Sequence, residues 1–152
     1  MKKSLHNDGD VKEILDRINF LSINHKSKWG RMNVAQMLEH CSLILKIATG
    51  EICIKSSNFV ICTLGAAAKY EMQIFNSGIP HNMPTFKKLI VNFDCDFESS
   101  KQHLIQSIKD YLEIFKSQKL PHSHPLFGKM TVESWGFFEY KHLDHHLKQF
   151  NI

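Results

Sequence analysis

The chain has 152 residues, of which 43% are hydrophobic and 22% charged, and its formal net charge at pH 7 is +4. This length can bury a core, so residues 1–152 are expected to form a single domain. The basic residues are scattered, which argues against the clustered basic face of a nucleic-acid-binding protein. The longest apolar run, residues 59–68, is half as long as the ~20 residues of a transmembrane helix, so no association with a membrane is expected.

The cysteines and the first residues indicate the cellular setting. None of the four cysteines forms a C-x-x-C pair, which argues against a thiolate zinc site or a thioredoxin-type motif. The N-terminal residues lack the apolar stretch of a signal peptide. We therefore expect a cytoplasmic protein with free thiols.

The first half of the chain contains two segments with the 3.6-residue apolar period of a helix. The first carries an apolar stripe from Val11 to Leu21, and Asp8 or Asp10 is expected to cap it. The second follows Asn33, a favourable N-cap residue, and ends before Gly50.

Two further helices are expected in the second half, at residues 96–116 and after Thr131. The connection between the second and third helices is about 45 residues long, which is unusual unless it crosses the bundle or covers a site. Within it, Ser57 to Tyr70 could form a short extra helix, Pro84 indicates a loop, and no convincing strand pattern appears. The pattern predicts an all-α fold, a four-helix bundle with a long connection between helices 2 and 3.

The last predicted helix contains a candidate metal-binding pair. His142 and His146 are four residues apart, which places both imidazoles on one helical face about 6 Å apart along the axis. Two ligands do not make a site, so a third must come from elsewhere. His40, on the second helix, lies at the edge of the apolar stripe and can face the last helix, which would complete a three-histidine site with open positions.

Other interpretations of these histidines remain open. A histidine at the edge of a core is often simply hydrogen-bonded, and His145 or Glu139 could enter the site as a further ligand. H-E-x-x-H is absent, and only one E-x-x-H, Glu139 to His142, is present, which argues against a zincin protease and a di-iron bundle. His122 and His124 form a second candidate chelate, which we predict to lie in a loop.

Two motifs resemble the DinB/YfiT-like metalloenzyme superfamily. The segment from Trp29 to His40, WGRMNVAQMLEH, resembles its second-helix signature, and His142-x-x-x-His146-x-x-Gln149 resembles its closing motif. The segments 124–131 and 141–146 look like one uncharacterised branch of that superfamily. The resemblance covers most of the chain, although residues 50–93 are not diagnostic.

The resemblance implies a four-helix bundle in which His40, His142 and His146 bind a divalent transition metal, nickel or zinc. Better-known members of the superfamily transfer low-molecular-weight thiols such as bacillithiol or use mycothiol in an isomerase. The resemblance therefore predicts a metal-dependent transferase or hydrolase with a small-molecule substrate, in which Glu139 or Gln36 could orient the nucleophile. The alternative is a non-catalytic metal-binding or stress-related bundle. Homodimerisation is left open.

Overall fold

The computed structural model describes residues 2–55, 59–81, 83 and 85–152 and is mostly helical, in agreement with the predicted all-α class. Five α-helices, one short 3₁₀-helix and a two-stranded antiparallel sheet make up its regular structure. In chain order these are α1 (Asp8–Phe20), α2 (Val34–Ala48), α3 (Phe59–Phe75), η1 (Lys87–Leu89), α4 (Phe97–Lys116), β1 (Ser123–His124), β2 (Gly128–Lys129) and α5 (Val132–Gln149).

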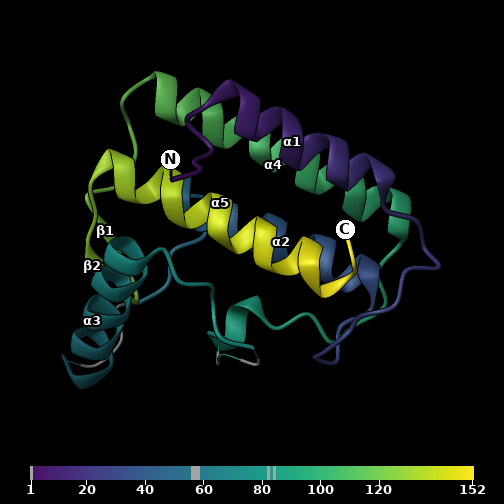
Figure 1. Cartoon of the computed structure of the whole chain (residues 1–152), viewed down its shortest axis with the longest axis horizontal. Coiled ribbons are helices and arrows are strands. Elements are labelled where there is room, and N and C mark those ends of the chain that lie inside the picture. The colour runs from purple at the N-terminus through teal and green to yellow at the C-terminus, as the bar shows by residue number, and fades with distance from the viewer. Residues whose placement is uncertain (1, 56–58, 82, 84) are drawn as a thin grey trace.

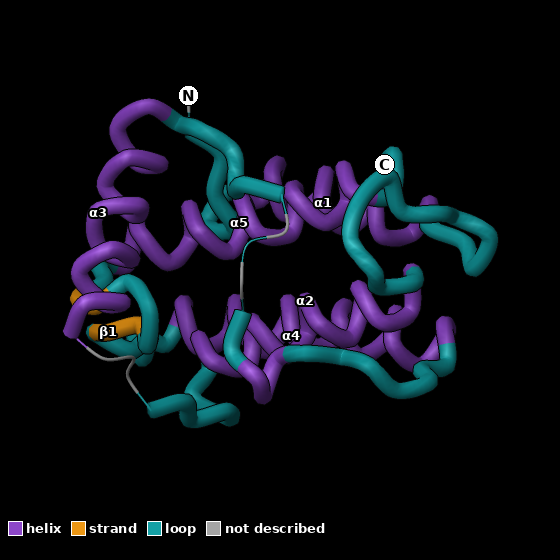
Figure 2. The backbone as a smooth tube through the Cα atoms, turned by 90° about the horizontal axis from the view of Figure 1, so that it is seen from below, coloured by secondary structure: helices purple, strands orange, loops and turns teal. Residues whose placement is uncertain are grey.

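The four helices α1, α2, α4 and α5 lie alongside one another (Figure 1). α2 packs along α4, and α5 contacts both α1 and α2. The helix α3 lies at one end of this group, beside the β1–β2 hairpin (Figure 2). The contact between α2 and α5 brings the two helices with the candidate metal ligands together.

The helix starts follow from their capping residues. The Asn33 side chain accepts a hydrogen bond from the Gln36 amide at 2.9 Å, and the Gln36 side chain accepts one from the Asn33 amide at 3.0 Å, which forms a capping box. At the starts of α5 and α4 a single side-chain bond forms the cap: the Thr131 side chain accepts from the Ser134 amide, and the Asp96 side chain accepts from the Ser99 amide. These starts confirm the predicted beginnings of the second, third and fourth predicted helices.

The cap of α1 differs from the prediction. Asn7, rather than Asp8 or Asp10, is the N-cap, and its side chain accepts a hydrogen bond from the Asp10 amide at 3.1 Å. Both aspartates lie in the first turn of α1 instead, where their negative charges favour the helix N-terminus.

The connection between α2 and α4 contains more structure than predicted. The helix proposed from Ser57 to Tyr70 is confirmed as α3, but it extends to Phe75, and Ser57 lies outside the described residues. The turn proposed at Pro84 also lies outside them. No strand was predicted in this connection, and its described residues contain none; the only strands in the described part of the chain, β1 and β2, form a hairpin later in the chain, between α4 and α5. Strands of two residues are too short for an alternating pattern to reveal them.

The core lies between α1, α2, α4 and α5 and includes polar side chains near the C-terminal half of α5. Large apolar residues such as Leu38, Ile108 and Trp135 are almost fully buried. The buried polar residues of α2 and α5 that matter below are His40, Glu139, His146 and Gln149. Across the described helices, we find none with both the length and the apolar character needed to cross a membrane.

Candidate metal centre

The structure brings together the three histidines predicted as ligands. One ring nitrogen from each of His40, His142 and His146 lies within 4.8 Å of the corresponding nitrogens of the other two. The ring centroids are 4.6 Å apart for His142 and His146, and 5.2 and 5.0 Å from His40 to His142 and His146. We call this set the three-histidine cluster. The cluster joins α2 to α5. His142 and His146 form an i, i+4 pair on α5, and His40 precedes His142 by 102 residues in the chain.

The spacing of the nitrogens fits a divalent transition metal. Tetrahedral zinc with Zn–N bonds of about 2.0–2.1 Å separates two nitrogen ligands by roughly 3.4 Å. The widest pair in the cluster is at most 4.8 Å apart, so modest side-chain rotations would close the cluster around an ion. Three ligands leave at least one coordination position open, as in catalytic zinc sites.

Hydrogen bonds fix the tautomers of two of the three rings. The Nδ1 atom of His40 lies 2.8 Å from the Leu89 carbonyl oxygen, and the Nδ1 atom of His146 lies 2.8 Å from the Gln149 Oε1. Because each partner is an oxygen that only accepts, both Nδ1 atoms carry the proton. The lone pair of each ring is therefore on Nε2, which makes no hydrogen bond with a described residue. This arrangement, with an outer oxygen orienting the ring, is typical of histidine metal ligands.

A second hydrogen bond holds Gln149 in place. Its Nε2 donates to the Trp29 carbonyl oxygen at 2.6 Å, which directs its Oε1 towards His146. The close approach requires Gly30, because a Cβ atom at that position would lie 2.6 Å from the Gln149 Nε2, and because the backbone there has a φ of +80°. The loop before α2 thus positions a ligand on α5.

His142 differs from the other two ligands. Its Nδ1 is buried and has no hydrogen-bond partner, and the same is true of the Glu139 Oε2. In the described part of the chain, these are the only buried side-chain nitrogen or oxygen atoms without a partner. Glu139 precedes His142 by three residues on α5, so both lie on one helical face.

Burial sets the charges of the cluster. Loss of solvent lowers the pKa of His40, lowers that of His146 to about 3, and lowers that of His142 well below its usual value, where repulsion from His146 and His40 adds to the effect. The rings are therefore neutral at pH 7, which is the form that binds metals. Burial raises the pKa of Glu139 to about 8.

The other candidate residues lie outside the cluster. The His124 Nδ1 accepts hydrogen bonds from the amides of Leu126 and Phe127 at 3.0 and 3.2 Å, so this lone pair is already used. Gln36 is occupied by its capping box and by a bond from its Nε2 to the Phe93 carbonyl oxygen, so the structure gives it no role near the histidines.

His145 borders the cluster without belonging to it. Its ring centroid is 5.0 Å from that of His146, but it also faces the rings of Trp29 and His81 at 5.6 and 5.9 Å. Sequence reasoning did not find Trp29, His81 or the Leu89 carbonyl as neighbours of the site. Among these neighbours, only the contact between Gln149 and His146 is indicated by the sequence, because Gln149 follows His146 by three residues.

These features define a mostly helical protein with a buried three-histidine cluster suited to a divalent metal. Residues 1–152 match the model of the family described as "Protein of unknown function (DUF1569)", and the chain belongs to this family. Comparison with curated proteins and with solved structures gave no match.

Proposed function

We propose that this protein is a metal-dependent enzyme in which His40, His142 and His146 hold one divalent ion, nickel or zinc, at a site open to a small-molecule substrate. The observation that carries the proposal is the approach of the three ring nitrogens to within 4.8 Å of one another. The Nδ1 bonds of His40 and His146 support it, because they leave Nε2 free to bind the ion.

The proposed fold type is a DinB/YfiT-like four-helix bundle formed by residues 1–152 as a single domain. The four helices α1, α2, α4 and α5 and the long connection between α2 and α4 are consistent with it. The two motifs that resemble that superfamily also carry the three histidines. The resemblance and the geometry therefore lead to the same three residues.

The chemistry would be hydrolysis or thiol transfer. A bound divalent ion lowers the pKa of a water ligand from about 15.7 towards ~7, or binds a thiol as its thiolate. Three neutral imidazoles leave the +2 charge uncompensated, which favours both effects. The protein's part is to hold the ligands in a site that is largely buried.

Glu139 is the group that we assign to proton transfer and orientation. Its carboxyl is buried, has an oxygen without a partner, and shares the helical face of His142 and His146. Burial raises its pKa to about 8 in the metal-free protein, and a divalent ion nearby would lower that pKa and so favour the carboxylate, the form that accepts a proton. Gln36, the other residue considered for this role, is held elsewhere by its hydrogen bonds.

The unpartnered oxygen of Glu139 also favours a second candidate function. Structural zinc sites are usually closed by four protein ligands. If Glu139 filled the fourth position, the site would be closed and the protein would be a non-catalytic metal-binding or stress-related bundle. The coordination number of the loaded protein separates the two candidates.

Metal analysis of the purified, untagged protein tests the proposal. We expect about one divalent ion per chain in the wild type and a loss of that ion in His40→Ala and His146→Ala. His124→Ala is the matched control and should retain the metal, because its lone pair already serves backbone amides. Wild-type protein with no more metal than the two ligand variants would refute the site. With metal confirmed, loss of hydrolase and thiol-transferase activity on metal removal tests the enzyme.

A further inference from the structure

Two cavities border α5, and they lie at opposite ends of it. One, of about 320 Å³, is lined by Glu133 and Trp135 near the start of the helix. The other, of about 670 Å³, is lined by Asp144 and His145 and lies roughly 16 Å further along the axis. We call the second the C-terminal cavity. It lies at the end of α5 that carries the three-histidine cluster.

One wall of the C-terminal cavity is made of rings and adjoins the cluster. The Trp29 and His81 rings stack with centroids 3.8 Å apart and an interplanar angle of 11°. His145 is tilted against both and also approaches His146, so it lies between the cavity and the cluster. The Trp29 carbonyl holds Gln149, which in turn orients His146. The cavity wall and a proposed metal ligand are therefore directly linked.

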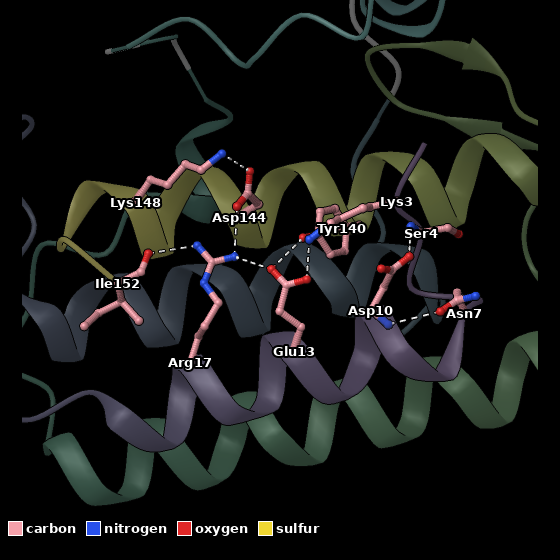
Figure 3. Close-up of polar contacts among 10 residues, drawn as sticks. All are labelled: Lys3, Ser4, Asn7, Asp10, Glu13, Arg17, Tyr140, Asp144, Lys148 and Ile152. Atoms are coloured by element: carbon pink, nitrogen blue, oxygen red, sulfur yellow. Dashed lines mark hydrogen bonds and ion pairs between the residues drawn. The ribbon is translucent and has the colours of Figure 1, made fainter. Parts of the chain in front are cut away.

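The side chains that line the cavity also include more positive than negative charges. Four cationic side chains line the cavity beside two carboxylates, and most of them belong to one network between α1 and α5 (Figure 3). In this network Asp144 accepts from both Arg17 and Lys148, at 2.9 and 2.7 Å, and Glu13 pairs with Lys3. In this network two side-chain carboxylates are paired with three cationic side chains, so the five side chains together carry a net positive charge.

The fourth cation, Lys141, has no carboxylate partner among the described residues. Its Nζ donates to the carbonyl oxygens of Asn76 and Ser77 at 2.8 and 3.0 Å. Both acceptors are neutral, so its charge is not compensated by a direct ion pair. An ammonium group has three donors, and two are used here, which leaves one for an anion in the cavity.

We propose that the C-terminal cavity binds a small organic anion, with Lys141 as its anchoring cation and the stacked Trp29 and His81 rings against its apolar part. None of the three cluster histidines lines this cavity, and His145 lies between the two, so the anion would bind beside the metal centre and not on the metal. The inference goes beyond the proposed function, because it assigns a second binding site next to the cluster and the chemical class of its ligand.

Titration of the full-length, metal-free protein with benzenesulfonate tests the inference, and benzyl alcohol serves as the neutral probe of similar size. Isothermal titration calorimetry gives the affinity, and the NMR signals of the His81 and His145 rings report the location. We expect benzenesulfonate to bind more tightly than benzyl alcohol and to shift both ring signals. A hydrogen bond to a charged group contributes about 1.5–3 kcal/mol, so Lys141→Gln should weaken binding by about tenfold or more.

Two further lysine variants keep the test decisive. Lys148→Gln removes a second charge of the cavity and should weaken binding by a smaller factor, whereas Lys109→Gln, an exposed lysine on α4 outside the cavity, should not. Equal affinity for the charged and neutral probes, or an unchanged affinity in Lys141→Gln, would overturn the inference. Because the probe is added without metal, zinc binding without benzenesulfonate binding refutes only the anion site, and the reverse result refutes only the metal centre.

Discussion

His146 in the three-histidine cluster and His124 in the hairpin are both shielded from solvent, and burial lowers the pKa values of the two rings to about 3 and about 4. Their Nδ1 atoms nevertheless have opposite roles. The His146 Nδ1 donates to Gln149, which leaves the Nε2 lone pair for a metal, whereas the His124 Nδ1 accepts from two backbone amides. Burial and a low pKa therefore do not identify a ligand. The direction of the Nδ1 hydrogen bond distinguishes these two rings.

The largest expected difference between the two regions concerns metal affinity. His40→Ala or His146→Ala removes one of three ligands and should weaken zinc binding more than the 10- to 100-fold that follows from loss of an outer hydrogen bond. His124→Ala should leave the affinity unchanged, because its lone pair is used by the hairpin. Competition with a chromogenic chelator measures both. Equal losses of zinc affinity in the cluster and hairpin variants would contradict different roles for His146 and His124.

A smaller effect is expected when the partner of a ligand is removed. Gln149→Ala deletes the oxygen that orients His146 and should lower zinc affinity by about 10- to 100-fold. Gln106→Ala is the control, since the Gln106 side chain donates to Asp110 on the surface of α4 and has no other hydrogen bond among the described residues. Zinc affinity that is the same in both variants would show that the Nδ1 bond of His146 does not prepare the ring for metal.

In the hairpin, the corresponding change should affect stability instead of metal binding. His124→Ala leaves the amides of Leu126 and Phe127 without their acceptor, at a cost of about 1–3 kcal/mol in the free energy of unfolding. His124→Asn offers a carboxamide oxygen in a similar place and should lose less. Urea denaturation of the three proteins gives the values. If His124→Asn lost as much unfolding free energy as His124→Ala, that result would contradict the role of the His124 ring as a hydrogen-bond acceptor.

The smallest expected effect is the dependence of hairpin stability on pH. The His124 pKa is lowered by burial and by the nearby Lys69 to about 4, against 6.5 for an unperturbed histidine. Between these values the unfolded chain binds the proton more readily, so stability falls as the pH falls from about 6.5 towards 4. At pH 5.5 this effect of His124 lowers the free energy of unfolding by on the order of 1 kcal/mol. The variant His124→Asn should lack this loss of stability at low pH. Parallel pH profiles of stability for the wild type and the variant would contradict the assignment of the loss to His124.

The sequence predicted the parts of the site that depend on helix geometry. The i, i+4 spacing of His142 and His146, the inward face of His40 and the caps Asn33 and Thr131 follow from local rules, and the structure agrees with each. These rules relate residues a few positions apart along one helix, so no tertiary information was needed.

The parts that were missed depend on contacts between distant segments. The Leu89 carbonyl reaches His40 from η1, 49 residues later in the chain, and a backbone acceptor leaves no mark on residue type. The stacking of Trp29 on His81 likewise joins two loops. His122 and His124 looked like a second chelate because residue type alone does not show which ring nitrogen is already bonded.

Long-range ¹H–¹⁵N NMR of the histidine rings, recorded before and after addition of zinc, tests whether His40, His142 and His146 together bind one metal ion. We expect the Nε2 signals of His40 and His146 and one ring-nitrogen signal of His142 to shift on zinc binding, while the Nδ1 atoms of His40 and His146 stay protonated and the His124 signals do not change. Unchanged signals of these ring nitrogens, or a response confined to His122 and His124, would contradict this expectation.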